Sequence, residues 1–512
     1  MNWQNYPFIR IVLPFILGMT GAYLFATHMD MAILFVLCCA LLSSLFFLLR
    51  KPKNKYRSTA FGIVAMTLSF AVGMALYTRK YQSIVQGIPQ DSTFCKGVLS
   101  AMPREKANSW ALNLKQDNGA HIILYIGKSK EDNTNDSECF SRLNIGDTIF
   151  AKIRHLTATK GDDNATKSSD DATFVPYHEY LFSQGICATC YTPSDQWHSR
   201  PRQSAASIFH SAKQLQHKLH STYNEHGIDG ESGNIIEAMT IGMKENLDAD
   251  TRRHYATAGT SHVLAMSGMH VGLIAIILQF FFITNMMPQQ WLWICNICII
   301  AILWCFAAIA GLSPSLIRAT LMFTTLLLCQ SFTHEVISIN SCALAIAIML
   351  CINPLYLNDA GFQFSFVSVG SICILGQLQT HPYPPHSRIL YLLKRIAYIS
   401  LICTIATAPL VAYHFGSIPL MSVASNIAII PFVYIIMFGS LLWWLFLWLA
   451  PVNTLLTNVL NWSADTMNNI VEGISTVPHA SIEWQPNAVV TALCYIPFLT
   501  IAYLLTIKLN RR

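Results

Sequence analysis

Apolar runs of about the length that a membrane-spanning helix needs occur along most of the chain. Three lie near the N-terminus, at about residues 8–26, 31–49 and 59–77. Eight more follow in the second half, at about 262–283, 291–310, 315–332, 336–352, 361–379, 396–413, 419–449 and 486–507. A helix needs about 20 residues to cross about 30 Å of hydrocarbon, and it satisfies its own backbone hydrogen bonds. The pattern therefore predicts a polytopic α-helical membrane protein.

Residues 80–195 have a different pattern, in which short strand-like runs replace the long apolar ones. The runs are 93–100, 109–115, 121–126, 147–156 and 185–192. Two polar stretches, 129–138 and 160–172, interrupt them as predicted loops. Five short strands with long loops suit a small open barrel of the oligonucleotide-binding (OB) type, and a generic β-sandwich fragment fits the pattern equally well. The fold class is then a polytopic α-helical membrane protein with a small external all-β, OB-like insert.

Residues 205–224 predict an amphipathic helix. Its apolar positions recur at helical spacing: Ile208, Ala212, Leu215, Leu219 and Tyr223. Such a helix lies on the membrane surface or, alternatively, packs on the insert. The predicted organisation is three transmembrane helices at 1–79, the external β domain at 80–195, interfacial helices at 196–258, and a membrane core of about eight segments at 259–512.

Composition and charge agree with this division. Of the 512 residues, 53% are hydrophobic and 12% charged, with a mean hydropathy of +0.41. Soluble domains carry roughly a quarter charged residues, so a soluble globule is excluded. The link at 50–57 has five basic residues, which places it and the N-terminus in the cytoplasm and the insert outside. The 419–449 run contains Pro431 and is too long for one straight crossing, so it is interpreted as broken or re-entrant, and the side of the C-terminus stays open.

Catalytic motifs are absent from the sequence. His334-Glu335 is not followed by a second histidine at the spacing of a zinc protease. There is no Gly-x-Ser-x-Gly and no Gly-rich phosphate loop with Lys. The chain is therefore predicted not to be an enzyme, and to need no metal or cofactor.

Polar residues instead occur where hydrocarbon would be expected, and they outline a candidate substrate path: His262, Ser267, His270, Arg318, Asp359, Gln363 and Asn426. A charge at the centre of a span costs about 2.5 to 3.5 kcal/mol on insertion scales, so Arg318 is expected to face the interior path. Each of these positions also has a purely structural interpretation. Residues 259–270 would only pack helices together, and Arg318 would extend its charge to the outer membrane interface. Asp359 would cap a helix, and Asn426 would hydrogen-bond backbone carbonyls freed by a helix break. We expect 261–270 to pack against 359–365, because two polar stretches in hydrocarbon satisfy one another.

Four cysteines belong to the insert: Cys95, Cys139, Cys187 and Cys190. An even count in an oxidising compartment suggests one or two disulfides. Residues three apart in a strand point to opposite faces, so Cys187 and Cys190 are not expected to bond to each other unless the strand bends. Two interpretations stay open: a disulfide from one of them to Cys95 or Cys139, or free structural thiols. A zinc site at Cys187 and Cys190 would need two further ligands, and no second Cys-x-x-Cys pair supplies them.

The membrane core resembles the ComEC family of bacterial competence proteins, and this resemblance rests on four strings in order. They are Ala256 to His270 (A-x-x-GTSHVLAMSGMH), Gly311 to Ala319 (GLSPSLIRA), Asn353-Pro354 with Asp359 to Phe366 (DAGFQFSF), and Ala408-Pro409 with His414 to Gly416 and Asn426. The N-terminal half is similar to the family's leading module, with Tyr180-Leu181 and Gly185 to Thr189 closing the barrel.

The resemblance implies an inner-membrane, multi-pass channel for uptake of single-stranded DNA during natural transformation. Its implied partners are single-stranded DNA, membrane lipid, a separate DNA receptor, a nuclease, a cytoplasmic motor and further copies of the chain in a homo-oligomer. Many relatives continue into a metallo-β-lactamase-like domain whose His-x-His-x-Asp-His signature is absent here, so no nuclease activity is expected in this polypeptide. A transporter or flippase for another polar solute, or a non-catalytic membrane assembly platform, are the rival functions.

Overall fold

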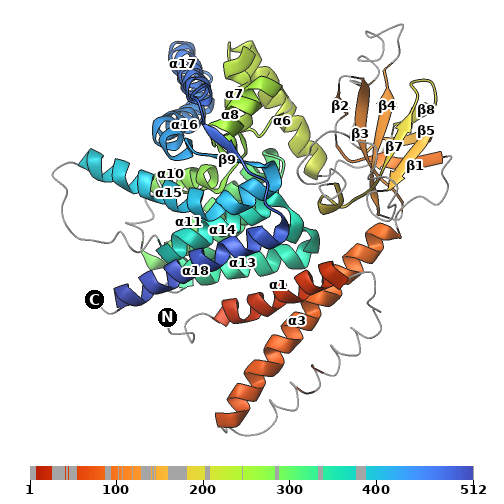
Figure 1. Ribbon diagram of the computed structural model, residues 1–512. Coiled ribbons are helices and arrows are strands. Elements are labelled where there is room, and N and C mark those ends of the chain that lie inside the picture. Colours follow the sequence, from red (N-terminus) through yellow and green to blue (C-terminus); the bar gives the residue numbers. More distant parts are fainter. Residues whose placement is uncertain are drawn as a thin grey trace. The chain divides into compact units, whose positions relative to one another are not determined.

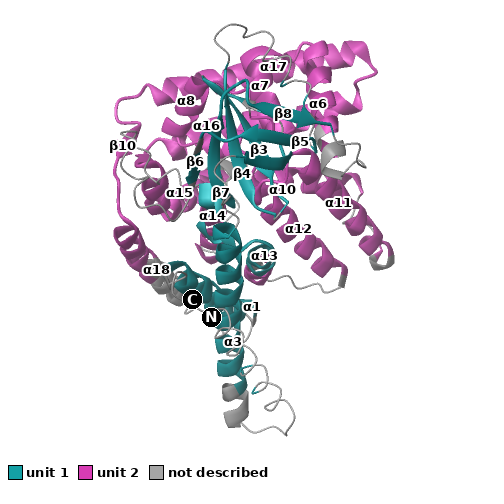
Figure 2. Ribbon diagram, turned by 90° about the vertical axis from the view of Figure 1, so that its right-hand side faces the viewer, with its two compact units in different colours: residues 1–206, 346–359 teal, residues 207–345, 360–512 magenta. Residues whose placement is uncertain are grey.

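The computed structural model describes residues 7–25, 55–86, 94–128, 140–158, 181–201, 208–282, 288–332, 338–375 and 388–510, apart from short gaps inside 94–158 and at 245, and also positions 41 and 44. The chain divides into two compact units (Figure 2). Unit 1 contains residues 1–206 and 346–359, and unit 2 contains residues 207–345 and 360–512. The predicted span at 31–49, apart from positions 41 and 44, and the two predicted polar loops of the insert lie outside the described residues.

Unit 1 begins with two helices, α1 (Pro7–Phe25) and α3 (Lys55–Val85), which pack closely against each other (Figure 1). Glycines make the close approach possible on both sides. A Cβ at Gly18 of α1 would lie 2.0 Å from the carbonyl oxygen of Phe70, and a Cβ at Gly73 of α3 would lie 2.2 Å from that of Phe15. Lipid supplies no hydrophobic force between helices, so van der Waals packing through such small residues holds the pair.

The described part of the β domain in unit 1 contains eight strands. Their bounds are β1 Phe94–Leu99, β2 Arg104–Glu105, β3 Ser109–Lys115, β4 His121–Gly127, β5 Thr148–Lys152, β6 His155–Ala158, β7 Ile186–Thr192 and β8 Trp197–Arg200. These include all five predicted runs, and the fourth run is divided into β5 and β6 by a bend at Ile153 and Arg154.

The strand pairings of the β domain form a path that closes into a ring when β5 and β6 are counted as one bent strand. β1 pairs with β3 and β5, β3 with β4, β4 with β7 and β7 with β6, while β5 and β6 are consecutive segments separated by two residues. The β4–β7 pair is parallel, and the other pairs are antiparallel. Inward residues such as Leu112, Leu124 and Ile149 are fully buried, and the rings of Trp110, Phe140 and Trp197 stack in sequence beside them.

Unit 2 is helical, with one two-stranded sheet. The bounds are α6 Ile208–Glu225, α7 Gly230–Thr240, α8 Ala249–Thr257, α9 Ser261–Leu264, α10 Gly268–Phe281, α11 Gln289–Ile309, α12 Pro314–Phe332, α13 Ser338–Ile352, α14 Ala360–Leu375, α15 Arg388–Phe415, β9 Ser417–Pro419, α16 Ser422–Leu445, α17 Ala450–Ser475, β10 Ser481–Glu483 and α18 Ala488–Asn510. The last residues of α13 and the 3-10 helix η4 (Pro354–Asn358) belong to unit 1. Among the described helices, α3, α11, α15 and α16 contain stretches long and apolar enough to cross a membrane.

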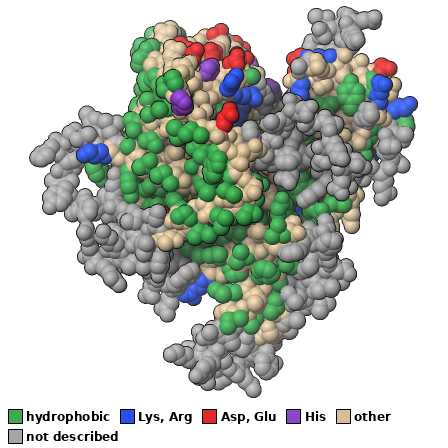
Figure 3. Space-filling view, viewed as in Figure 1, with side chains coloured by type: hydrophobic (Ala, Val, Ile, Leu, Met, Phe, Trp, Pro, Cys, Tyr) green, Lys and Arg blue, Asp and Glu red, His purple; other side chains and the backbone are tan. Residues whose placement is uncertain are grey.

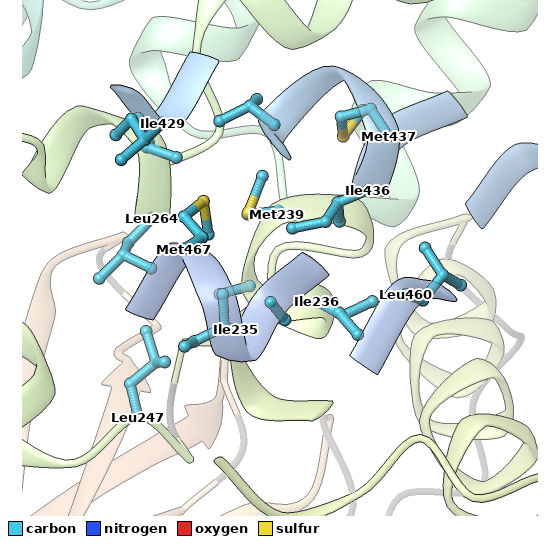
Figure 4. Packing of buried hydrophobic residues seen from close by; sticks show 14 of the residues in the cluster. Ile235, Ile236, Met239, Leu247, Leu264, Ile429, Ile436, Met437, Leu460 and Met467 are labelled. Atoms are coloured by element: carbon cyan, nitrogen blue, oxygen red, sulfur yellow. The ribbon is translucent and has the colours of Figure 1, made fainter. Parts of the chain in front are cut away.

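The largest hydrophobic core lies where α7, α16 and α17 meet. Ile235, Ile236 and Met239 of α7 pack among Ile436 of α16 and Met467 of α17, all within one buried cluster (Figure 4). The α17 helix was not predicted, because asparagines and threonines dilute its apolar positions below the density of a span. Its buried positions instead recur on one helix face, and they complete this core.

Two membrane predictions need correction. The 419–449 run is not a broken helix, because β9 precedes it and α16 continues without interruption through Pro431. The interruption occurs instead in the predicted 262–283 span, where α9 ends at Leu264 and α10 begins at Gly268. The predicted amphipathic helix matches α6, which packs against α7 and α11, with Tyr223 fully buried.

Candidate functional site

The interruption between α9 and α10 places polar groups beside non-helical backbone. Ala265 has ψ 127° and Ser267 has φ −120° and ψ 170°, so this stretch is extended between two helices. Ser267 caps α10 by accepting a hydrogen bond from the backbone N–H of Met269 at 3.3 Å. His262 is exposed in the preceding short helix, while His270 is 1% exposed.

The hydrogen bonds of His270 fix its tautomer. Its Nδ1 accepts from the backbone N–H of Ser267 at 3.1 Å and lies 2.9 Å from the Ser267 hydroxyl. A neutral imidazole that accepts at Nδ1 carries its proton on Nε2. That Nε2 is buried, and no side-chain or backbone partner for it exists among the described residues. His270 therefore carries a buried N–H donor that no described group accepts.

The first turns of α10 lie close to α12, because the residues of α10 that face α12 there are glycines without side chains. A Cβ at Gly268 would lie 3.5 Å from the Cβ of Ala319, and a Cβ at Gly272 would lie 3.2 Å from the Phe323 ring. Arg318, the neighbour of Ala319, is 3% exposed. Its guanidinium carbon lies 5.2 Å from the centre of the Phe366 ring of α14, where a cation–π contact offsets part of the cost of burial.

Hydrogen bonds between side chains connect α14, α15 and α16. The amide oxygen of Gln363 lies 3.0 Å from Nε2 of His414, and Asn426 donates from Nδ2 to the hydroxyl of Ser400 at 2.8 Å. In a membrane core each such bond replaces water that the groups would otherwise need. Gln363 and Asn426 therefore tie neighbouring helices together through partners on α15.

Asp359 belongs to a different part of the molecule from the other predicted site residues, because it is the last residue of unit 1. Its Oδ2 accepts a hydrogen bond from Nε2 of Gln184, which precedes β7, at 3.1 Å. The adjacent Asn358 donates from Nδ2 to the hydroxyl of Tyr77 in α3 at 2.8 Å. Asp359 thus links the end of η4 to the segment before β7, and Asn358 links η4 to α3.

The structure thus groups six of the seven predicted residues in unit 2, on α9, α10, α12, α14 and α16. Helix α12 packs against both α10 and α14, whereas neither α9 nor α10 is among the main packing partners of α14. The predicted direct packing of 261–270 against 359–365 is therefore not confirmed. Sequence reasoning missed the partners Phe366, Ser400, His414 and Gln184. Phe366 and His414 lie in the quoted motif strings, whereas Ser400 and Gln184 gave no signal.

The insert's cysteines occupy the β domain as follows. Cys95, Cys187 and Cys190 are buried free thiols, and Cys139 lies outside the described residues. The Cys190 thiol donates a hydrogen bond to Cys95, and this bond together with burial raises the pKa of Cys190. Cys187 is the extra residue of a β-bulge between the Ile186 and Ala188 pairings with β4. Cys95 and Cys190 are thus close enough to interact, and a disulfide between them stays a prediction. The predicted alternatives that use Cys139 lie outside the described residues. Over the described residues, no group of three potential ligands surrounds a metal position.

Comparison with known proteins gives one family match and two similar proteins. The model of the competence protein family matches residues 239–508, a range that contains all seven predicted path residues. ComE operon protein 3 of Bacillus subtilis is 25% identical over 256 residues, which are 50% of this chain and 31% of that protein. Recombination protein 2 of Haemophilus influenzae is 23% identical over 256 residues, 47% of this chain and 30% of that protein. Each match thus covers less than a third of the relative's length, and no solved structure matches. Because the family match covers more than half of the 512 residues, this chain belongs to the ComEC family of competence proteins.

Proposed function

We propose that this protein is the inner-membrane channel through which single-stranded DNA enters the cell during natural transformation. The family description, competence protein, supports a role in natural transformation, and one of the similar proteins is named as a recombination protein. The observation that carries the channel itself is the extended backbone at residues 265–267 between α9 and α10. Non-helical backbone among apolar helices is tolerated only where protein buries it or where it lines a water-filled path.

The donors beside this backbone fit a phosphate-bearing strand. The Nε2–H of His270 is a buried donor, and the Arg318 charge lies in the adjacent helix α12. A polyanion in transit needs contacts that are favourable enough for entry and weak enough for exit. Among the described residues Arg318 is the one buried arginine, and a lining with so little fixed charge meets that demand better than a strongly basic one, which would hold the strand.

The β domain supports the same function if it is an OB-type barrel, which we infer from its strand order. Taking β5 and β6 as one bent strand, the ring runs first, second, third, fifth and fourth strand in chain order. This Greek-key ring of five strands is the OB arrangement, a fold used for oligonucleotides and oligosaccharides. We place it outside the cytoplasmic membrane, where it receives the strand. A DNA receptor, a nuclease and a cytoplasmic motor are the proposed partners.

Arg318 gives the direct test. Arg318→Gln keeps a polar side chain that can donate hydrogen bonds but removes the charge, so the frequency of transformation by marked DNA is expected to fall at least tenfold at unchanged protein level in the membrane. Arg253→Gln is the matched control, because Arg253 is exposed on α8 and its loss is expected to change nothing. Transformation by the Arg318→Gln variant at the wild-type frequency would contradict a role in the path.

A further inference from the structure

The outer face of β1, β5 and β8 carries a second feature that the sequence did not suggest. Residues paired across an antiparallel ladder point to the same side. Lys96 of β1 pairs with Phe150 of β5, which pairs with His198 of β8. The exposed and buried positions alternate along β1 and β5, so the whole outward set is Phe94, Lys96, Val98, Thr148, Phe150, Lys152, His198 and Arg200.

This set, named here the β1–β5–β8 face, combines cations with exposed aromatic rings. Phe94 is 69% exposed and Phe150 is 40% exposed, although rings of this size usually contribute to a core. Phe94 pairs with Lys152 and Phe150 pairs with Lys96, so each ring stands beside a lysine on the neighbouring strand. Figure 3 shows Lys and Arg side chains next to hydrophobic ones on the β domain, at the upper right.

Charge on this face differs from the charge of the insert as a whole. Residues 80–195 contain 12 Lys and Arg against 14 Asp and Glu, which gives a net charge of −2. From this total the sequence predicted no basic surface for phosphates on the insert. Eight of those acidic residues lie in the stretches 129–138 and 160–172, outside the described residues. The outward positions of the face include no carboxylate, although Lys96 on the face forms an ion pair with the exposed Asp117 at 2.8 Å.

The opposite face of the ring is covered. OB barrels commonly bind oligonucleotides on the face of their second and third strands, which here are β3 and β4. On that face Ala111 and Ile123 pack with Leu181 into a buried cluster, and Tyr125 and Ile186 contact it. Residues just before β7 therefore occupy the usual ligand face, while the β1–β5–β8 face stays exposed.

We propose that the β1–β5–β8 face binds single-stranded DNA, with Phe94 and Phe150 stacking on bases and Lys96, Lys152 and Arg200 contacting phosphates. Every base has a face on which an aromatic ring can stack, so this binding needs no particular sequence. The alternation of rings and cations on a sheet matches a strand whose bases and phosphates alternate at similar spacing. This inference rests on the proposed function, because the cargo that it names is the strand that the membrane core conducts.

Binding is measured on the full-length protein in nanodiscs by the fluorescence anisotropy of a labelled oligothymidylate of about 16 nucleotides, the upper site size of one OB barrel. Phe94→Ala and Phe150→Ala are each expected to weaken the Kd by about fivefold or more. Lys152→Gln is expected to lower the salt dependence of log Kd by about 0.7, the value for one phosphate contact on a single strand.

Matched controls come from the same domain. Phe94→Tyr retains a stacking ring and is expected to retain affinity. Tyr191→Ala removes a ring that is 39% exposed on β7, and Lys128→Gln removes a lysine paired with Glu105 at 2.6 Å, so neither is expected to change the Kd. Equal affinities of Phe94→Ala, Phe150→Ala and Tyr191→Ala would overturn the proposal.

An anionic membrane surface is the rival partner, because lysines with exposed phenylalanines also bind lipid headgroups. Benzoylphenylalanine placed at position 94 separates the two by cross-linking whatever lies against it. An adduct with the oligonucleotide is expected, and an adduct with lipid alone would overturn the proposal. If substitutions on the face leave DNA binding unchanged while Arg318→Gln still lowers transformation, the proposed channel function stands and only the proposed DNA-binding face is refuted.

Discussion

The contact between α1 and α3 gives a sharp test of how these membrane helices pack. Gly18→Ala adds one methyl group at a position where a Cβ would lie 2.0 Å from the carbonyl oxygen of Phe70. Carbon and oxygen atoms in ordinary contact are about 3.3 Å or more apart, so the helices must separate by about 1 Å. The atom in the way is backbone, and no side-chain rotation relieves the clash.

Separation by this distance removes much of the packing between the helices. Phe15, Met19, Ala22 and Ala71 are at most 6% exposed in this pair. A gap of about 0.5–1 Å loses a quarter to a half of each dispersion contact, and overpacked cores typically lose about 1–3 kcal/mol. In lipid no hydrophobic term compensates, so we expect the association of α1 and α3 to weaken by about 2–3 kcal/mol.

Alkylation of a cysteine at the contact reports the change. Ala22 is fully buried, so Ala22→Cys is expected to be protected from N-ethylmaleimide in the full-length protein, as measured by mass spectrometry of its peptide. Adding Gly18→Ala is expected to raise the alkylation rate at least tenfold. Gly21→Ala is the control, because its Cβ would lie 3.7 Å from Met74 in ordinary contact. Equal rates for the two alanine variants would refute the packing argument.

Three further predictions concern other parts of the chain. Burial raises the pKa of Glu237, so the folded state holds this proton more tightly than the unfolded state, and stability falls as pH rises from the usual carboxyl range through the raised pKa; Glu237→Gln is expected to flatten this decline in thermal melts. Under oxidising conditions a Cys95–Cys190 bridge is expected to raise stability by about 2–4 kcal/mol and to vanish from non-reducing peptide maps in Cys95→Ser; a map that shows both thiols free after oxidation would refute it. Trp443→Phe removes the bond that Nε1 donates to Thr457 at 2.8 Å and leaves space in a closed core, so denaturant melts are expected to show a loss of about 2–3 kcal/mol.

Much of the fold could be predicted because its signals are local. The strands at 109–115 and 121–126 alternate or cluster apolar residues within a single element, and the structure places β3 and β4 there. Helix α17 was not predicted, because its burial depends on contacts with α7, α8 and α16, and the local sequence pattern does not reveal these contacts. Pro431 misled for a related reason, because α16 continues through a residue that usually interrupts a helix.

The candidate site was less predictable than the fold, because it depends on pairing between distant residues. Arg318 was predicted to face the interior because a charge in a span is costly, and in the structure its side chain is buried against the Phe366 ring. Asp359 looked equivalent in sequence, yet it bonds Gln184, 175 positions away, and belongs to unit 1. The β1–β5–β8 face was invisible for the same reason, since β1, β5 and β8 are remote in the chain and the net charge of the insert has the opposite sign.

The fate of labelled DNA in a strain that lacks this gene tests the central claim most directly. Cells are given radiolabelled duplex DNA, treated with external nuclease and fractionated, and single-stranded label inside the cytoplasm is measured. The channel predicts that this protected label disappears in the deletion strain while DNA still binds the cell surface, and that the wild-type gene restores it. Protected single strands at the wild-type level in the deletion strain would contradict the claim.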